Sequence, residues 1–307
     1  MGKQLAIVIP AYKGTFLRAA LDSIAAQTCQ DFTLYIGDDC SPYQLGDIVD
    51  EYRSKIDVVY QRFETNLGGK DLVAQWERCI AMSQGEPYIW LFSDDDVMEP
   101  MCVEEFCNHL KATNSSYDIY HFNVKILNEK THIAQLTNSY PQSLGNYDYY
   151  KGKLMGKYMS LVVENIFSRS VYEKCGGFKK FDLAWGSDTA TWVLFSERTG
   201  FYTIENTYVV WRSSNENISP DFSNSIVARK VNALLSFFEW SYNYFKSNGK
   251  SCLYVNIRAF ISRMRVFCNY ISEEQIHHVV REFCKFHNCS YLQGGLFLLI
   301  KNLRKRI

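Results

Sequence analysis

The sequence has no run of 18 apolar residues, so we predict no membrane-spanning helix. It also has no net charge, because Lys plus Arg and Asp plus Glu both number 33, and thus no overall basic field that would attract nucleic acid. The ten cysteines show neither CxxC pairs nor zinc-type spacing, which argues against a disulfide framework or a zinc site. We expect reduced thiols in a cytoplasmic protein that binds no nucleic acid.

The composition that is present favours a large packed core. Hydrophobic residues make up 47% and aromatic residues 15% of the 307 positions, enough for one large domain or for a domain with an appendage. Residues 1–4 lead directly into a strand-like run, and we therefore expect no targeting segment.

The first 130 residues alternate between two hydrophobic patterns. Short apolar runs predict strands at 5–10, 32–39, 56–63 and 88–93. Helical spacing between them predicts helices at 15–27, 44–52 and 70–84. This alternation predicts an α/β fold with a mostly parallel central sheet that is flanked by helices.

The remainder of the chain is mixed and then helical. We predict strands at 117–127 and 202–214, a helix at 184–200, and a strand or short helix followed by a glycine turn at 160–178. A helical pattern begins near residue 224, after a Ser- and Asn-rich stretch at 213–224 that reads as a linker or mobile loop. We therefore divide the chain into a domain at 1–220, with halves of about 1–115 and 116–220, and a helical C-terminal region at 221–307.

Polar residues follow each of the first four predicted strands. They are Pro10-Ala11-Tyr12, Asp38-Asp39, residues 66–70 and Asp94-Asp95-Asp96. Ligands of open α/β sheets bind beyond the carboxyl ends of the strands, so these four segments should converge on one crevice.

The acidic triplet Asp94-Asp95-Asp96 has two interpretations. Aspartates cap helices, and Pro100 could begin one. Alternatively, the carboxylates are oxygen ligands for Mg²⁺ or Mn²⁺. Neighbouring side chains of an extended segment point to opposite faces, so the three cannot all bind one ion unless a turn begins here.

Several short motifs resemble those of family 2 glycosyltransferases, which have the GT-A fold. They are "VIPAY" (8–12), "LDSIAAQT" (21–28), "YIGDDCS" (35–41), "NLGG" (66–69), "GEPYIWLFSDDD" (85–96), "GGF" (176–178) and "RSSNENIS" (212–219). The resemblance covers about residues 4–220. It implies an inverting enzyme that transfers a sugar from a nucleotide-diphosphate donor, by family habit a UDP-sugar, to a hydroxyl of a glycan or lipid-linked glycan acceptor in polysaccharide assembly.

The resemblance also implies nucleotide-binding residues. Asp39 falls where a carboxylate accepts a hydrogen bond from the base, and Pro10, Ala11 and Tyr12 fall at the base pocket. Lys70 would lie near the base or the diphosphate, and Arg212 would clamp the diphosphate, since guanidinium groups suit phosphate. The alternatives are that Tyr12 covers the sheet end as a turn aromatic and that Lys70 is a solvated lysine.

The implied metal ligands are Asp95 and Asp96, with Asp94 assigned to ribose or sugar hydroxyls. Asp96 could instead contact the sugar or cap a helix. The family's first motif aspartate is replaced by Ser93, and many relatives carry a histidine where this chain has Ser214. Both departures leave open a non-catalytic nucleotide-sugar binder or scaffold that retains the fold.

Asp188 matches the position of the family's general base, which would deprotonate the acceptor hydroxyl. The alternative is a helix N-cap, for which Ser187 competes. The tail at 295–307 joins an apolar block to basic residues. It is either an ordinary terminal helix or a peripheral contact with the inner membrane face.

Overall fold

The computed structural model describes residues 2–214 and 222–303, and the chain divides into two compact units. The first comprises Met1–Tyr149, Tyr158–Phe178 and Thr191–Glu216. The second comprises Tyr150–Lys157, Lys179–Ala190 and Asn217–Ile307. Each unit is therefore built from segments that are separated in the sequence.

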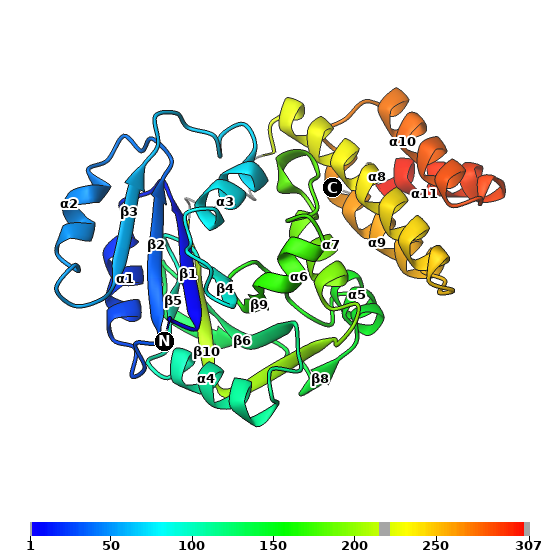
Figure 1. Cartoon of the computed structure of the whole chain (residues 1–307). Coiled ribbons are helices and arrows are strands. Elements are labelled where there is room, and N and C mark those ends of the chain that lie inside the picture. Colours follow the sequence, from blue (N-terminus) through cyan, green and yellow to red (C-terminus); the bar gives the residue numbers. More distant parts are fainter. Residues whose placement is uncertain (1, 215–221, 304–307) are drawn as a thin grey trace. The chain divides into compact units, whose positions relative to one another are not determined.

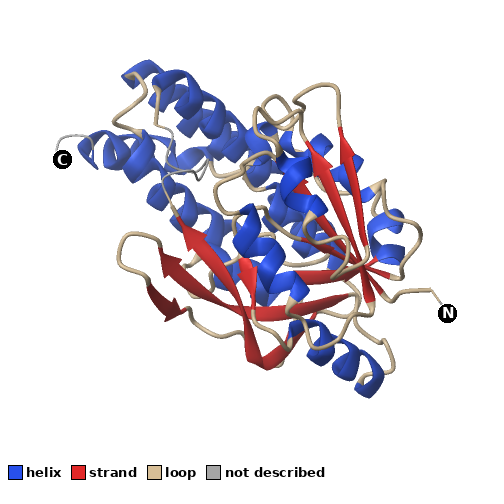
Figure 2. Cartoon of the chain, turned by 90° about the vertical axis from the view of Figure 1, so that its left-hand side faces the viewer, coloured by secondary structure: helices blue, strands red, loops and turns tan. Residues whose placement is uncertain are grey.

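The first unit contains a 10-stranded sheet in the order β3-β2-β1-β4-β9-β6-β10-β5, with β7 paired to β6 and β8 to β10. The strands are β1 Leu5–Ala11, β2 Phe32–Asp38, β3 Val58–Arg62, β4 Tyr88–Leu91, β5 Val97–Met98, β6 Ile119–Asn128, β7 Ile133–Leu136, β8 Ser143–Leu144, β9 Asn165–Ser168 and β10 Phe201–Ser213. In Figure 2 the red strands form one continuous twisted sheet within this unit.

Most strands of the sheet run in one direction. β1 is parallel to β2 and β4, β2 is parallel to β3, and β6 is parallel to β10. Because β9 is antiparallel to both β4 and β6, β4 and β6 also share a direction. The carboxyl ends of β1, β2, β3, β4, β6 and β10 therefore lie along one edge, which confirms the mostly parallel α/β fold predicted from the sequence.

The helices that begin in the first unit are α1 Leu17–Ala25, α2 Leu45–Asp50, α3 Leu72–Ile80, α4 Cys102–Ala112, α5 Asn146–Leu154 and α6 Arg169–Lys174. In Figure 1, α1 and α2 lie on one side of the strands β1 to β3 and α3 lies on the other. Both faces of β1 and β2 are thereby covered, which explains why nearly all of their residues are buried and most are apolar. Asp71 caps α3 by accepting a hydrogen bond from the Ala74 amide at 2.9 Å.

The second unit is helical among its described residues. Its elements are η1 Asp182–Ala184, α8 Asn224–Ser247, α9 Leu253–Phe267, α10 Glu273–Phe286, η2 Ser290–Leu292 and α11 Gln293–Leu303. Phe260 of α9 stacks on Phe283 of α10 with 4.1 Å between ring centroids, and Phe238 of α8 packs edge-on against Phe283. The predicted C-terminal helices are thus confirmed. Helix α7, Ser187–Phe195, begins in this unit and continues into the first.

Differences from the predicted elements concentrate in the middle of the chain. The segment 160–178 holds both a strand, β9, and a short helix, α6, and then turns at Gly176 and Gly177, whose φ angles are 71° and 89°. Helix α5 was not predicted because its apolar residues do not follow helical spacing. Part of the predicted linker at 213–224 lies outside the described residues.

Two of the predicted absences can be compared with the described part of the chain. No helix there is long and apolar enough to cross a membrane. All ten cysteines lie within the described ranges, and each is a free thiol.

Candidate functional site

The exits of β1 and β4 are joined by Asp94. Its Oδ2 accepts hydrogen bonds from the backbone amides of Tyr12 and Lys13, both at 2.8 Å. The chain leaves β1 at Ala11, so these amides are the first ones beyond the strand. Asp94 therefore holds the loop after β1 against the end of β4, as expected from the convergence of the strand exits.

Asp95 is engaged through both of its carboxylate oxygens. Oδ2 accepts a hydrogen bond from the Lys13 ammonium at 2.8 Å, and Oδ1 accepts one from the Ser93 hydroxyl. Ser93 stands where the family carries its first motif aspartate, so this departure supplies a donor to the neighbouring carboxylate. Lys13 was not predicted as a site residue.

Asp96 connects the segment that follows β4 to β10. Its Oδ1 accepts a hydrogen bond from the Arg212 amide at 2.8 Å, while the Arg212 Nε donates to the Asp95 carbonyl at 2.8 Å. The Arg212 guanidinium also pairs with Glu129 and lies 4.4 Å over the Phe16 ring. Arg212 thus lies beside the acidic triplet, and its role as a diphosphate clamp stays a prediction.

The three aspartates are crowded and buried, with exposed fractions of 5%, 6% and 2%. Burial, and then the neighbouring charge of Asp95, raise the pKa of Asp94 to about 6, although the Tyr12 and Lys13 amides oppose the shift. Burial and Asp95 also raise the pKa of Asp96. Burial is the larger cause of both shifts, so a cation bound beside these side chains would offset part of the cost of ionising them.

These side chains fit a hard divalent cation only in part. Within residues 2–214 and 222–303, no three His, Cys, Asp or Glu side chains are arranged as a metal site. Mg²⁺, however, usually takes only one or two carboxylates and completes its shell with water and substrate phosphates. The carboxylate oxygens of the three buried aspartates are consistent with that mode.

Asp39 fixes the loop that follows β3. Its Oδ1 accepts from the Leu67 amide at 2.6 Å and its Oδ2 from the Gly68 amide at 2.8 Å. The Arg78 guanidinium also donates to Oδ1, and the Asp39 amide donates to the Ala11 carbonyl at 2.9 Å. Asp39 thus lies between the exits of β1 and β3, while its predicted contact with a base stays a prediction.

Asp38 forms a second bonded cluster at the end of β2. Its Oδ2 accepts from the Tyr60 hydroxyl at 2.6 Å and from Arg62 at 3.0 Å, and its Oδ1 accepts from the Ser41 amide at 2.7 Å. The Ser41 hydroxyl donates to the Tyr12 carbonyl at 2.6 Å. Ser41 therefore joins the loop after β2 both to the end of β2, through Asp38, and to the loop after β1, through Tyr12.

The remaining predicted nucleotide-binding residues lie at the same edge with different exposure. Pro10 is half-buried and Ala11 is buried in the last part of β1, whereas the Tyr12 side chain is 42% exposed and available for stacking. Lys70 is exposed, and its amide closes a turn onto the Leu67 carbonyl at 2.9 Å. These residues lie at the edge where the strands end, and the contacts assigned to them stay predictions.

Asp188 belongs to the second unit, where it occupies the first turn of α7. Its side chain is half-buried, and the Thr189 hydroxyl donates to Oδ1 at 3.4 Å. Burial raises the pKa of Asp188, and the charge of Lys153 opposes the shift. The competing cap residue Ser187 is occupied by the Phe181 amide, which donates to its hydroxyl at 2.9 Å.

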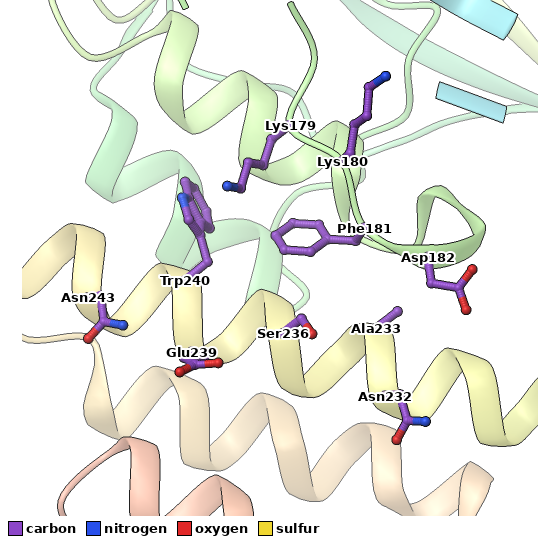
Figure 3. Close-up of a pocket in the computed structure, with 10 residues that line it drawn as sticks. All are labelled: Lys179, Lys180, Phe181, Asp182, Asn232, Ala233, Ser236, Glu239, Trp240 and Asn243. Atoms are coloured by element: carbon purple, nitrogen blue, oxygen red, sulfur yellow. The ribbon is translucent and has the colours of Figure 1, made fainter. Parts of the chain in front are cut away.

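An open groove of about 470 Å³ also lies in the second unit, between residues 179–182 and α8. Figure 3 shows the Phe181 ring and the Lys179 side chain facing Trp240 across the groove, with Ser236 below them, while Lys180 points away. Segment 179–182 runs directly into η1 and α7, the helix that carries Asp188. None of the acidic triplet lines this groove.

Three basic residues of the first unit were missed by the sequence analysis. Arg62 ends β3 and could have been found by the rule that singled out the other strand exits. Lys13 directly follows the exit of β1 and could have been found by the same rule, whereas Arg78 carries no such signal because its contact depends on how α3 packs against the sheet.

Comparison with known structures supports the fold. The Staphylococcus aureus TarS 1–349 crystal structure aligns with 98% of this chain and 90% of its own, with a TM-score of 0.59 and 15% identity. The same protein in complex with UDP-GlcNAc aligns over the same shares with a TM-score of 0.56 and 15% identity.

Sequence relatives cover shorter stretches. Poly(ribitol-phosphate) beta-N-acetylglucosaminyltransferase TarS of Staphylococcus aureus is 31% identical over 96 residues, 30% of this chain and 16% of the relative. The uncharacterized glycosyltransferase RP339 of Rickettsia prowazekii is 29% identical over 130 residues, 42% of this chain and 38% of the relative. The chain thus spans well under half the length of these relatives. The family model of Glycosyl transferase family 2 matches residues 6–175, more than half of the chain, and the chain therefore belongs to this family.

Proposed function

We propose that this chain is an inverting glycosyltransferase that moves a sugar from a nucleotide-diphosphate donor, preferably a UDP-sugar, to a hydroxyl of a glycan or lipid-linked glycan acceptor. The observation that carries the proposal is the set of hydrogen bonds by which Asp94, Asp95 and Asp96 join the carboxyl ends of β1, β4 and β10. Family membership supports the reaction class. The UDP-GlcNAc complex of a protein with this fold makes UDP-GlcNAc the first donor to test.

The donor would bind along the edge formed by the strand exits. Tyr12 offers an exposed ring on which a base can stack. Arg212, whose Nε bonds to the Asp95 carbonyl, would clamp the diphosphate, and Lys70 is an exposed cation that would approach it. A divalent metal bound to Asp95 and Asp96 would neutralise charge on the departing diphosphate. Asp94 stabilises the loop that carries Tyr12.

Asp188 is proposed as the general base. Transfer with inversion requires a base that removes the proton of the acceptor hydroxyl as the hydroxyl attacks the anomeric carbon. A carboxylate whose pKa is raised by burial is a stronger base than a solvated one, and this is the direction of the shift at Asp188. The positive charge of Lys153 opposes that shift.

The proposal is tested by donor binding and turnover measured separately. A panel of UDP-, GDP- and dTDP-sugars is screened by thermal shift with Mn²⁺, because a ligand that binds only the folded state raises its melting temperature. Release of nucleoside diphosphate is then measured with and without glycan acceptors. We expect a UDP-sugar to stabilise the protein and to be consumed only when an acceptor is present.

Asp188→Asn should retain the donor-induced thermal shift and lose transfer by at least about a hundredfold, the usual size of a general-base contribution. Asp182→Asn is the matched control, since Asp182 lies in the same unit, is exposed and pairs with Arg229. It should keep parental transfer. Equal transfer by parent and Asp188→Asn would remove Asp188 from the mechanism. Donor binding without any acceptor-dependent release would favour a nucleotide-sugar-binding protein instead.

A further inference from the structure

Lys13 is tied to the acidic triplet through both its backbone and its side chain. The amide donates to Asp94 Oδ2 and the ammonium to Asp95 Oδ2, each at 2.8 Å. The Lys13 side chain is 24% exposed, whereas that of Asp95 is 8% exposed. The ammonium therefore reaches inward from the loop after β1 to a carboxylate that is nearly enclosed.

This ion pair engages Oδ2 of Asp95, the side chain proposed above as a metal ligand. The other oxygen of Asp95 already accepts the Ser93 hydroxyl. The nearby guanidinium of Arg212 bonds to the Asp95 carbonyl and pairs with Glu129. Of the three groups described here, Lys13 is the one that sets a full positive charge against the Asp95 carboxylate.

We propose that Lys13 is an exchangeable counter-ion of Asp95. In the absence of donor, the Lys13 ammonium pairs with the Asp95 carboxylate and opposes the binding of a divalent metal alone. When nucleotide and metal enter together, the ammonium moves from Asp95 to the donor diphosphate and pairs with it there. The inference rests on the proposed function for the identity of the donor and the metal. It adds that the metal binds well only together with the nucleotide.

The chemistry of lysine suits this exchange. Its ammonium is a compact charge on a flexible four-carbon stem, so it can change partners while its backbone stays fixed. A metal that displaced it without a diphosphate would leave the ammonium without this carboxylate partner, which is costly at a partly buried site. A diphosphate offers new oxygens to the ammonium and removes that cost.

The hydrogen bond from the Lys13 amide to Asp94 allows the side chain of Lys13 to be tested separately from its backbone. Replacing Lys13 by Met or Gln removes the ammonium but keeps the amide that donates to Asp94, so the loop should stay anchored. Lys13→Arg retains a positive charge. Lys111, an exposed lysine of α4, provides the matched control as Lys111→Met.

Binding of Mn²⁺ without nucleotide is measured by the loss of the free-ion electron paramagnetic resonance signal. We expect Lys13→Met and Lys13→Gln to bind Mn²⁺ about tenfold more tightly than the parent, because the competing cation is gone. Lys13→Arg and Lys111→Met should resemble the parent, and Asp95→Ala should lose binding. UDP should raise Mn²⁺ affinity by a larger factor in the parent than in Lys13→Met.

Three outcomes would overturn the counter-ion role. The first is unchanged or weaker Mn²⁺ binding by Lys13→Met and Lys13→Gln when their circular dichroism spectra show that both are folded. The others are an equal increase in Mn²⁺ affinity for Lys111→Met and a lack of Mn²⁺ binding by the parent and all variants. Donor binding is scored separately by the thermal shift that UDP-GlcNAc produces in EDTA and in Mn²⁺. A shift that persists while the Mn²⁺ results fail removes the role of Lys13 and leaves the proposed donor. Loss of both removes the proposed function as well.

Discussion

At the scale of single residues, three identical neighbours in the sequence have three different environments. Asp94 accepts two amides from the loop after β1, Asp95 pairs with Lys13, and Asp96 accepts an amide from β10. The sequence predicts the position of these carboxylates because they follow an apolar strand. It does not predict their partners, because those partners lie about 80 and about 115 positions away along the chain.

His121 on β6 is a buried residue outside the candidate site. Its Nδ1 lies 3.2 Å from the Asn165 Oδ1, its ring stacks on Tyr140 at 3.9 Å, and its Nε2 has no hydrogen-bond partner among the described residues. Burial lowers the pKa of His121 to about 3, and the side chains of Asn165 and Asn123 oppose the shift. The imidazole is therefore neutral in the folded protein at neutral pH.

This residue should make the fold sensitive to acid. The pKa in the folded state lies below the ordinary value of 6.5, so the contribution of neutral His121 is present above pH 6.5 and is lost as the pH falls toward 3. His121→Gln cannot be protonated. Between pH 7 and pH 4.5 the parent should lose about 2 kcal/mol more unfolding free energy than His121→Gln, measured by urea denaturation. Equal losses would show that His121 is not protonated on unfolding in this range.

At the scale of elements, helix α3 approaches β2 at Gly37. A Cβ at this position would clash with the Cys79 Sγ and would lie 2.9 Å from the Phe63 ring. The Gln75 side chain donates to the Gly37 carbonyl at 3.3 Å at the same contact. The hydrophobic pattern predicted both elements, but it could not predict this close approach, which depends on the absence of a side chain.

Gly37→Ala should therefore destabilise the protein by about 1–3 kcal/mol, the usual cost of overpacking a core. The double variant Gly37→Ala/Cys79→Ala should be less destabilised than the sum of its single changes, since it removes the sulfur that clashes. Urea unfolding of the three variants measures the coupling. Gly46→Ala is the control, because its added Cβ meets nothing nearer than 3.4 Å. Strict additivity would mean that another contact limits the approach of α3.

At the scale of the whole molecule, the second unit is assembled from distant pieces of the chain. The Tyr150 hydroxyl lies within hydrogen-bond distance of Ser241 on α8 and Asn256 on α9, and Trp185 packs against Phe267 on α9. These contacts join residues 150–157 and 179–190 to the C-terminal helices. A sequence pattern is read along the chain, so it predicts a single boundary near residue 220 and cannot predict that two earlier segments pack with the residues beyond it.

A chain that ends at Ser214 distinguishes a domain boundary near residue 220 from a second unit that includes residues 150–157 and 179–190. If residues 150–157 and 179–190 depend on the C-terminal helices, removal of these helices uncovers Tyr150, Phe181 and Trp185, which pack on Phe245, Phe237 and Phe267. Exposed aromatic surface promotes aggregation, so we expect a lower soluble yield and several-fold higher fluorescence of a hydrophobic dye. A chain ending at Leu303 is the control and should resemble the parent. A soluble, dye-silent chain 1–214 that unfolds cooperatively would instead support an independent domain that ends near residue 220.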